Sequence, residues 1–109
     1  MITKVLVNAT AMSASETVNS SVETIHMAKG NRGLVCYKVA SYSGSGNVTC
    51  KLQGRTNPDM DWVEVDNSSK NISSSTADAV EDIQLFPEMR ATVTTAAGTT
   101  GTVSVHLGA

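Results

Sequence analysis

The side chains best suited to covalent chemistry are two cysteines, Cys36 and Cys50, and two histidines, His26 and His106. A catalytic thiol needs a base within hydrogen-bond reach, and no recognisable motif joins either histidine to a cysteine. The many serines and threonines form no G-x-S-x-G elbow, phosphate-binding loop or H-E-x-x-H pattern. These observations predict a chain that is not an enzyme and that uses no cofactor.

Two groups of acidic residues are the candidates for metal ligation. The first consists of Asp59, Asp61, Glu64 and Asp66, and the second of Asp78, Glu81 and Asp82. Neither group has the glycine and the ligand spacing of an EF-hand loop. Alternation along a strand also directs Glu64 and Asp66 to a solvent-exposed face. We therefore predict solvated acidic faces and no metal site.

Trp62 and Tyr42 are the candidate residues for contact with a ligand or partner. The chain has one tryptophan, two tyrosines and one phenylalanine, so a stacking platform has few candidates. Trp62 follows the turn Asn57-Pro58-Asp59. An exposed Trp62 would suit a sugar ring, whereas a packed Trp62 would close one end of the fold.

Charge and hydropathy exclude two classes of partner. The formal net charge is -2 and only 17% of residues are charged, so no basic stripe is present to replace the counterions of a nucleic acid. No apolar run approaches the roughly 18 residues needed to cross a bilayer. We expect neither nucleic acid nor a membrane as a partner.

The elements that must position these residues read as β-strands, because apolar residues recur at every second position between turn formers. The predicted strands are residues 2–9, 22–27, 34–41, 48–54, 62–65, 79–86, 89–95 and 102–107. The polar stretch 67–76 is predicted to be a long mobile loop. A chain of 109 residues with about eight strands predicts a single all-β domain, an antiparallel β-sandwich of jelly-roll or immunoglobulin-like type.

Residues 34–41 and 48–54 are expected to form a hairpin around Ser43-Gly44-Ser45-Gly46, since glycine permits the positive φ of tight turns. That hairpin would pair Val39 with Cys50, Tyr37 with Leu52 and Val35 with Gly54. Its buried face would then hold Val35, Tyr37, Val39, Val48, Cys50 and Leu52. Cys36 would lie on the opposite face from Cys50, which predicts two free thiols. Residues 89–95 and 102–107 are likewise expected to form a hairpin.

Four segments carry a resemblance to a known group of proteins. They are Lys51-Leu52-Gln53-Gly54-Arg55, Asp61-Trp62-Val63-Glu64-Val65, the run from Leu85 to Val93 that contains Pro87 and Arg90, and Gly101-Thr102-Val103-Ser104-Val105. Together they resemble small β-sandwich proteins encoded among tailed-bacteriophage structural genes. The aromatic residue usual after the proline in that group is replaced here by Glu88-Met89.

The resemblance implies a virion component, assembled in the host cytoplasm. The expected role is a capsid decoration (cement) protein that stabilises the head shell, or a tail or head-fibre module. The implied partners are the major capsid protein or other virion proteins, with a homotrimer as one expected assembly. Residues 1–20 would supply a strand and a contact arm, and residues 21–109 the sandwich. The alternative is a carbohydrate- or receptor-binding module of a phage tail or a secreted enzyme, with Trp62 or Tyr42 in the contact.

Overall fold

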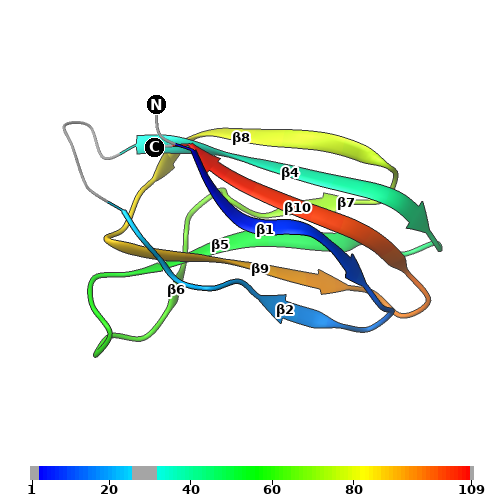
Figure 1. The fold of residues 1–109 in the computed structure, drawn as a ribbon, viewed down its shortest axis with the longest axis horizontal. Helices are drawn as coiled ribbons and strands as arrows, with labels where there is room; N and C mark the ends of the chain where they lie inside the picture. The colour runs from blue at the N-terminus through cyan, green and yellow to red at the C-terminus, as the bar shows by residue number, and fades with distance from the viewer. Residues whose placement is uncertain (1–2, 26–31, 109) are drawn as a thin grey trace.

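The computed structural model describes residues 3–25 and 32–108, and they form two antiparallel β-sheets packed face to face (Figure 1). No helix occurs in these two ranges. The strands are β1 (Thr3–Met12), β2 (Thr17–Asn19), β3 (Glu23–Thr24), β4 (Arg32–Ser43), β5 (Val48–Arg55), β6 (Val63–Glu64), β7 (Lys70–Ile72), β8 (Thr76–Gln84), β9 (Glu88–Thr95) and β10 (Thr100–Gly108). The predicted all-β antiparallel sandwich is thus confirmed, with ten strands among the described residues.

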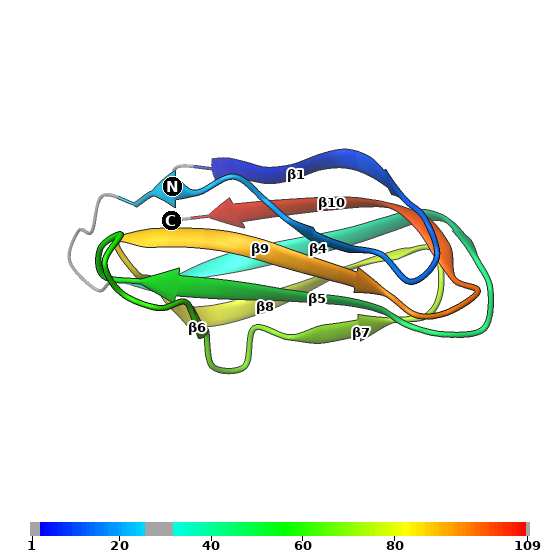
Figure 2. The ribbon, with the colours of Figure 1, turned by 90° about the horizontal axis from the view of Figure 1, so that it is seen from below.

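The first sheet has the strand order β1-β10-β4-β8, and the second has β2-β9-β5-β6. Two short strands extend the second sheet, because β3 also pairs with β9 and β7 also pairs with β5. Figure 2, seen from below, shows β9 and β5 of the second sheet in front of β4 and β8 of the first. Every pairing is antiparallel.

The core lies between the sheets and follows from the alternation in the sequence. Along β5, each second residue from Val48 to Gly54 is buried, and the residues between them are partly exposed. The six residues predicted to form one buried face, Val35, Tyr37, Val39, Val48, Cys50 and Leu52, are each at most 1% exposed. Complete burial of an aliphatic side chain contributes about 1.5–3 kcal/mol, so this face is a main source of stability.

The predicted hairpin between residues 34–41 and 48–54 is wrong. β4 pairs with β10 and β8 in the first sheet, whereas β5 pairs with β9, β6 and β7 in the second. Val39 lies opposite Val103 and Thr76, and Cys50 lies opposite Val93 and Lys70. The two strands therefore pack face to face across the core. Alternation assigned the correct residues to the interior, but it does not distinguish a neighbour in a sheet from a neighbour across the core.

The predicted C-terminal hairpin is wrong for the same reason, since β9 belongs to the second sheet and β10 to the first. The crossing from β4 to β5 and the crossing from β9 to β10 meet at one end of the sandwich. The Gly46 amide donates to Thr99 Oγ1 at 2.9 Å, and the Ala96 amide donates to the Asn47 carbonyl at 3.0 Å. Gly44 has a φ of 121°, and a Cβ there would lie 2.3 Å from the Gly98 carbonyl oxygen. Glycine is therefore required where the crossings touch.

The stretch 67–76, predicted to be a long mobile loop, contains strand β7 and two buried residues. Ile72 is 3% exposed and Ser68 is fully buried. β7 pairs with the first half of β5, through Val48, Thr49 and Cys50. Alternation of apolar and polar residues did not reveal this strand, because Ile72 is the one apolar residue in the stretch.

The two cysteines are free, as predicted: Cys36 is exposed and Cys50 is buried. The prediction assumed a hairpin that does not exist. It still gives the right result, because alternation places Cys36 on the outer face of β4 and Cys50 on the inner face of β5. Residues 3–12 form an edge strand paired with β10, and residues 17–19 form a short strand paired with β9. His26 and the end of the predicted strand 22–27 lie outside the described residues.

Candidate contact surface on the second sheet

The outer face of the second sheet carries a continuous row of polar side chains. They are the residues of β5 and β9 that alternate with the core: Thr49, Lys51, Gln53 and Arg55 on β5, and Glu88, Arg90, Thr92 and Thr94 on β9. The register places them opposite each other in pairs, so that Gln53 faces Arg90 and Arg55 faces Glu88. Cross-strand neighbours on one face lie close enough to interact directly.

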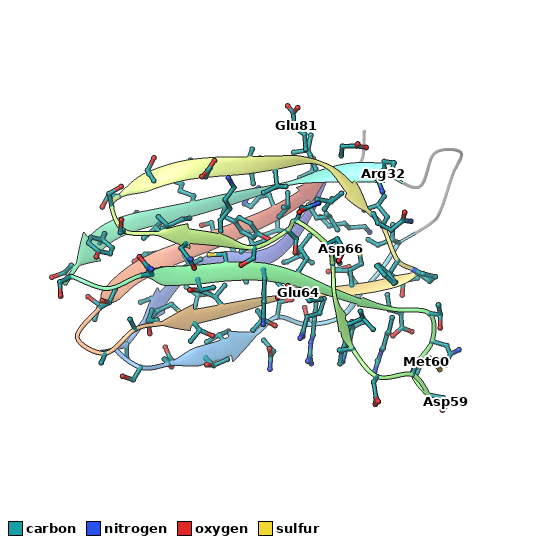
Figure 3. All side chains as sticks on the ribbon, turned by 180° about the vertical axis from the view of Figure 1, so that it is seen from behind. Arg32, Asp59, Met60, Glu64, Asp66 and Glu81 are labelled. Carbon is teal, nitrogen blue, oxygen red and sulfur yellow. The ribbon has the colours of Figure 1, made fainter. Side chains whose placement is uncertain are left out.

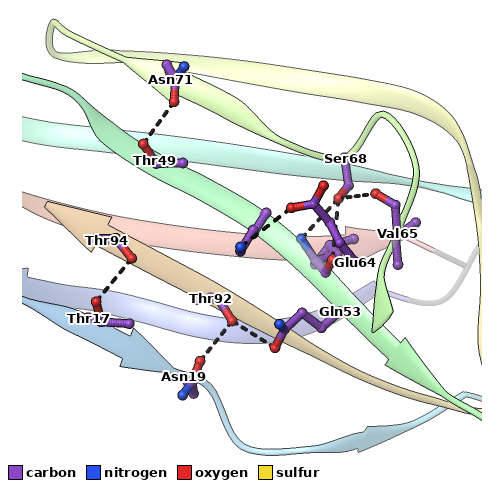
Figure 4. A network of polar contacts seen from close by, with 12 residues as sticks. Thr17, Asn19, Thr49, Gln53, Glu64, Val65, Ser68, Asn71, Thr92 and Thr94 are labelled. Atoms are coloured by element: carbon purple, nitrogen blue, oxygen red, sulfur yellow. Dashed lines mark hydrogen bonds and ion pairs between the residues drawn. The ribbon is translucent and has the colours of Figure 1, made fainter. Parts of the chain in front are cut away.

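These side chains are linked by hydrogen bonds across β2, β9 and β5 (Figure 4). The Thr92 hydroxyl lies 2.8 Å from Asn19 Oδ1 and 3.2 Å from Gln53 Oε1, so its single proton serves one acceptor at a time. Arg90 Nε donates to Gln53 Oε1 at 2.8 Å. At the far edge, the hydroxyls of Thr17 and Thr94 are 3.2 Å apart. The network holds the outer face in one arrangement.

Trp62 lies over this face and contacts two arginines. The Cζ atoms of Arg55 and Arg90 are 4.2 and 4.4 Å from the centroid of its ring. A guanidinium at this distance from an indole gains cation–π attraction, about 0.5–1 kcal/mol at an exposed site and more where water is excluded. Arg55 Nε also bonds Glu88 Oε1 at 2.9 Å, and both of those side chains are 18% exposed. Trp62 is itself half-buried.

The structure thus places Trp62 against two arginines on the outer surface and outside the interior core. A sugar ring that stacked on the indole would have to use the same ring as Arg55 and Arg90, or displace one of their guanidinium groups. The aromatic residue was identifiable from sequence, as a tryptophan after a turn. Arg55 and Arg90 were not, because only the pairing of β5 with β9 brings them together.

Tyr42, the second predicted contact residue, lies at the opposite end of β5. Its hydroxyl donates to the Gly46 carbonyl at 2.6 Å, just before β5 begins, whereas Trp62 contacts Arg55 at the end of β5. Tyr42 is half-buried and packs against the core. The two predicted contact residues are therefore not part of one site, and Tyr42 mainly fixes the chain crossing.

The acidic residues of the first predicted group are all exposed, and a lysine pairs with one of them. Asp59 lies beside Met60 at the tip of the loop that precedes Trp62, and Glu64 and Asp66 follow along the chain (Figure 3). Glu64 lies 3.5 Å from Lys51 Nζ. Within residues 3–25 and 32–108, no three His, Cys, Asp or Glu side chains are grouped to hold a metal ion.

The second acidic group is also on the surface. Asp82 Oδ1 accepts a hydrogen bond from Arg32 Nε at 2.9 Å, which lowers the pKa of that carboxyl. Asp78 lies 3.7 Å from Lys70 Nζ. Asp78 stands opposite the core residue Tyr37, so it lies on the inner face of edge strand β8, but at the open edge of the sandwich, where its side chain is 48% exposed. Inward-pointing charges on edge strands discourage further strand pairing.

The sequence did not indicate that a histidine and a cysteine lie side by side on the first sheet. The register of β10 with β4 places His106 directly opposite Cys36, and both are exposed on the outer face of the first sheet. The next cross-strand neighbour of His106 is Val5 on β1, and the next cross-strand neighbour of Cys36 is Ala79 on β8. Neither flanking side chain has a polar group that could orient an imidazole, so the pair does not have the third member of a nucleophilic triad in its row.

Two interior groups have perturbed acidity without any role in a site. Burial raises the pKa of the Cys50 thiol to about 12. Burial also raises the pKa of Tyr37, whose hydroxyl donates to the Ser68 carbonyl at 2.8 Å. Both groups stay neutral in the folded protein, as groups of a packed core do.

The fold and this surface define an antiparallel β-sandwich with a rigid, hydrogen-bonded polar face centred on Trp62. A comparison with models of protein families gives no match to the chain, and a search of curated proteins gives no significant match either. No helix in the described part of the chain is long and apolar enough to span a membrane.

Proposed function

We propose that the chain is a structural protein of a tailed-bacteriophage virion, specifically a capsid decoration protein that stabilises the head shell. The observation that supports this best is the pre-ordered face around Trp62, Arg55 and Arg90. Tryptophan and arginine are the residue types enriched at the energetic centres of protein interfaces. The segments that resemble phage sandwich proteins supply all three residues.

A rigid surface suits a cement role because binding then orders few additional side chains. Each rotamer-rich side chain immobilised at an interface costs about 0.5–1.5 kcal/mol, and the hydrogen bonds between Asn19, Thr92, Gln53 and Arg90 have already restricted those residues. The partner in this proposal is the major capsid protein or another virion protein. Assembly takes place in the host cytoplasm, with a trimer of this chain as one arrangement on the shell.

Edges of the sandwich offer further contact. β1 and β8 are the outer strands of the first sheet, and β8 is exposed over most of its length. In this proposal β1 and β2, from the N-terminal segment 1–20, supply the contacts that reach neighbouring subunits. The proposed contacts are therefore spread over one sheet face and its adjoining edges.

Co-sedimentation with empty phage capsids, over a range of temperatures, tests the proposal. We expect saturable binding at a fixed stoichiometry and a rise in the melting temperature of the shell. Trp62→Ala should weaken binding while leaving the far-ultraviolet circular dichroism unchanged. Asn71→Ala serves as the matched control, because Asn71 is exposed on the same sheet face and bonds Thr49, away from Trp62 and the two arginines. Unsaturable or absent capsid binding would reject the proposal.

A second candidate is a carbohydrate- or receptor-binding module. The observation in its favour is the position of Trp62, which is half-buried beside a face with the amides of Asn19 and Gln53 and the hydroxyl of Thr92. A glycan panel on the same preparation distinguishes the two functions. Glycan binding that Trp62→Ala removes, together with indifference to capsids, would establish this second candidate and exclude the first.

A further inference from the structure

Counting only residues that the structure describes, the outer face of the second sheet has three cationic side chains, and two of them already have carboxylate partners. Lys51 lies 3.5 Å from Glu64, and Arg55 lies 2.9 Å from Glu88. Arg90, the third, has no carboxylate within ion-pair distance among the described residues, although it is half-buried. Within the described part of the chain, Arg90 therefore carries a positive charge on this face that no carboxylate compensates.

The remaining hydrogen-bonding groups of Arg90 are held in a fixed orientation. Nε is bonded to Gln53 Oε1 at 2.8 Å, and Cζ lies 4.4 Å from the centroid of the Trp62 ring. Gln53 is itself restrained, since its Oε1 is 3.2 Å from the Thr92 hydroxyl. Among residues 3–25 and 32–108, no side chain or carbonyl accepts a hydrogen bond from the two terminal nitrogens of the guanidinium. These two nitrogens form the planar fork that binds both oxygens of a carboxylate.

We infer that Arg90, positioned by Gln53 and Trp62, is a binding site for a carboxylate from an acidic side chain of a partner protein. The identification of that partner as a virion protein rests on the proposed function, but the site rests on the geometry alone. Arg55, Glu88 and Arg90 together leave one positive charge around the indole. One net positive charge and one planar fork match a carboxylate, whereas the second negative charge of a dianionic phosphate would be left uncompensated and would be repelled more strongly by Glu88.

The single tryptophan makes the site directly observable. Trp62 is the only tryptophan in the chain, so its fluorescence reports on this surface alone. The intact protein is titrated with a tetraglutamate peptide blocked at both ends, with the matching tetraglutamine peptide, and with inorganic phosphate. We expect a saturable fluorescence change with tetraglutamate only, with a dissociation constant on the order of millimolar because few groups make contact. Added salt should weaken the binding.

Gln53→Glu is the decisive variant. A glutamate at this position keeps an acceptor for Arg90 Nε and for Thr92 and adds an internal carboxylate, so it should compete with the peptide for Arg90. We expect the affinity for tetraglutamate to fall by about tenfold or more. The matched control is Asn71→Asp, which adds the same charge to the same face and keeps the acceptor for the Thr49 hydroxyl. Its affinity should stay within about twofold of the wild type.

Arg90→Lys provides an independent variant, since it keeps the charge and removes the planar fork. It should also lose most of the tetraglutamate affinity. Circular dichroism and thermal unfolding of each variant show whether it remains folded. Wild-type binding by either Gln53→Glu or Arg90→Lys would overturn the inference, as would an equal loss in Asn71→Asp, which would indicate unspecific electrostatics. Tighter binding of phosphate than of tetraglutamate would overturn the choice of a carboxylate.

The peptide and capsid experiments separate the two proposals. If tetraglutamate binds as expected and capsids are ignored, the carboxylate site is established and the decoration role fails. If capsids bind saturably and the peptide does not, the decoration role is supported and the carboxylate site is rejected.

Discussion

Ser68 replaces a missing strand partner at the edge of the second sheet, and its removal should destabilise the fold. β6 pairs with Gln53 and Gly54, while β7 pairs with Val48, Thr49 and Cys50, which leaves a gap beside Leu52. The Ser68 hydroxyl fills the gap by accepting a hydrogen bond from the Leu52 amide at 3.1 Å and donating one to the Val65 carbonyl at 2.7 Å. Ser68 is fully buried, so water does not reach the Leu52 amide in its place.

The expected cost of Ser68→Ala follows from which groups lose a partner. The Val65 carbonyl keeps the Ser68 amide as a donor at 3.2 Å, but the Leu52 amide is left unpaired. An unsatisfied buried donor costs about 1–3 kcal/mol, and the lost bond to Val65 adds a fraction of that. We expect the free energy of unfolding to fall by about 2–3 kcal/mol. That is a large part of the 5–15 kcal/mol typical of a domain.

Urea unfolding followed by circular dichroism and by Trp62 fluorescence measures this loss. With a denaturant slope of about 1–2 kcal/mol/M, the midpoint should fall by about 1–3 M. Ser69→Ala is the matched control, because the neighbouring Ser69 is exposed and should change the free energy of unfolding by less than about 0.5 kcal/mol. A Ser68→Ala midpoint equal to that of the control would refute the idea that the hydroxyl completes the sheet edge.

Three further predictions concern the interior. In the native protein a thiol reagent should modify Cys36 alone, and Cys50 should react only after unfolding; labelling of two thiols without unfolding would contradict the assigned faces. Gly54→Ala should lower stability by about 1–3 kcal/mol, because the added Cβ would lie 2.4 Å from the Phe86 ring, and a thermal melt unchanged from wild type would argue against that contact. The Cys50 thiol has its pKa raised from 9.0 to about 12, so the unfolded chain releases this proton at lower pH than the folded protein does. The free energy of unfolding should therefore fall as pH rises between those values, by roughly 4 kcal/mol, and Cys50→Ala should lose less over the same range in urea titrations.

The candidate surface was only partly predictable from the sequence. Trp62 could be singled out because a lone tryptophan after a turn is a natural contact residue. Its arginine partners could not, since Arg55 and Arg90 belong to strands distant in the chain, and only the register of β5 with β9 places both at the indole. The same holds for His106 and Cys36, which share no motif and meet through the register of β10 with β4.

The sequence by itself determined the class of fold and the two faces of the main strands. Alternation of apolar and polar residues identified Val35, Tyr37 and Val39 as interior, and the parity of Cys36 and Cys50 excluded a bridge between them. The tertiary structure alone decided which strands pair. A period of two reports that a residue is buried, but a buried face is satisfied equally by a neighbour in the same sheet or in the opposite one. A glycine-rich turn fits a hairpin and a crossing between sheets alike, so the choice depended on packing of the whole core.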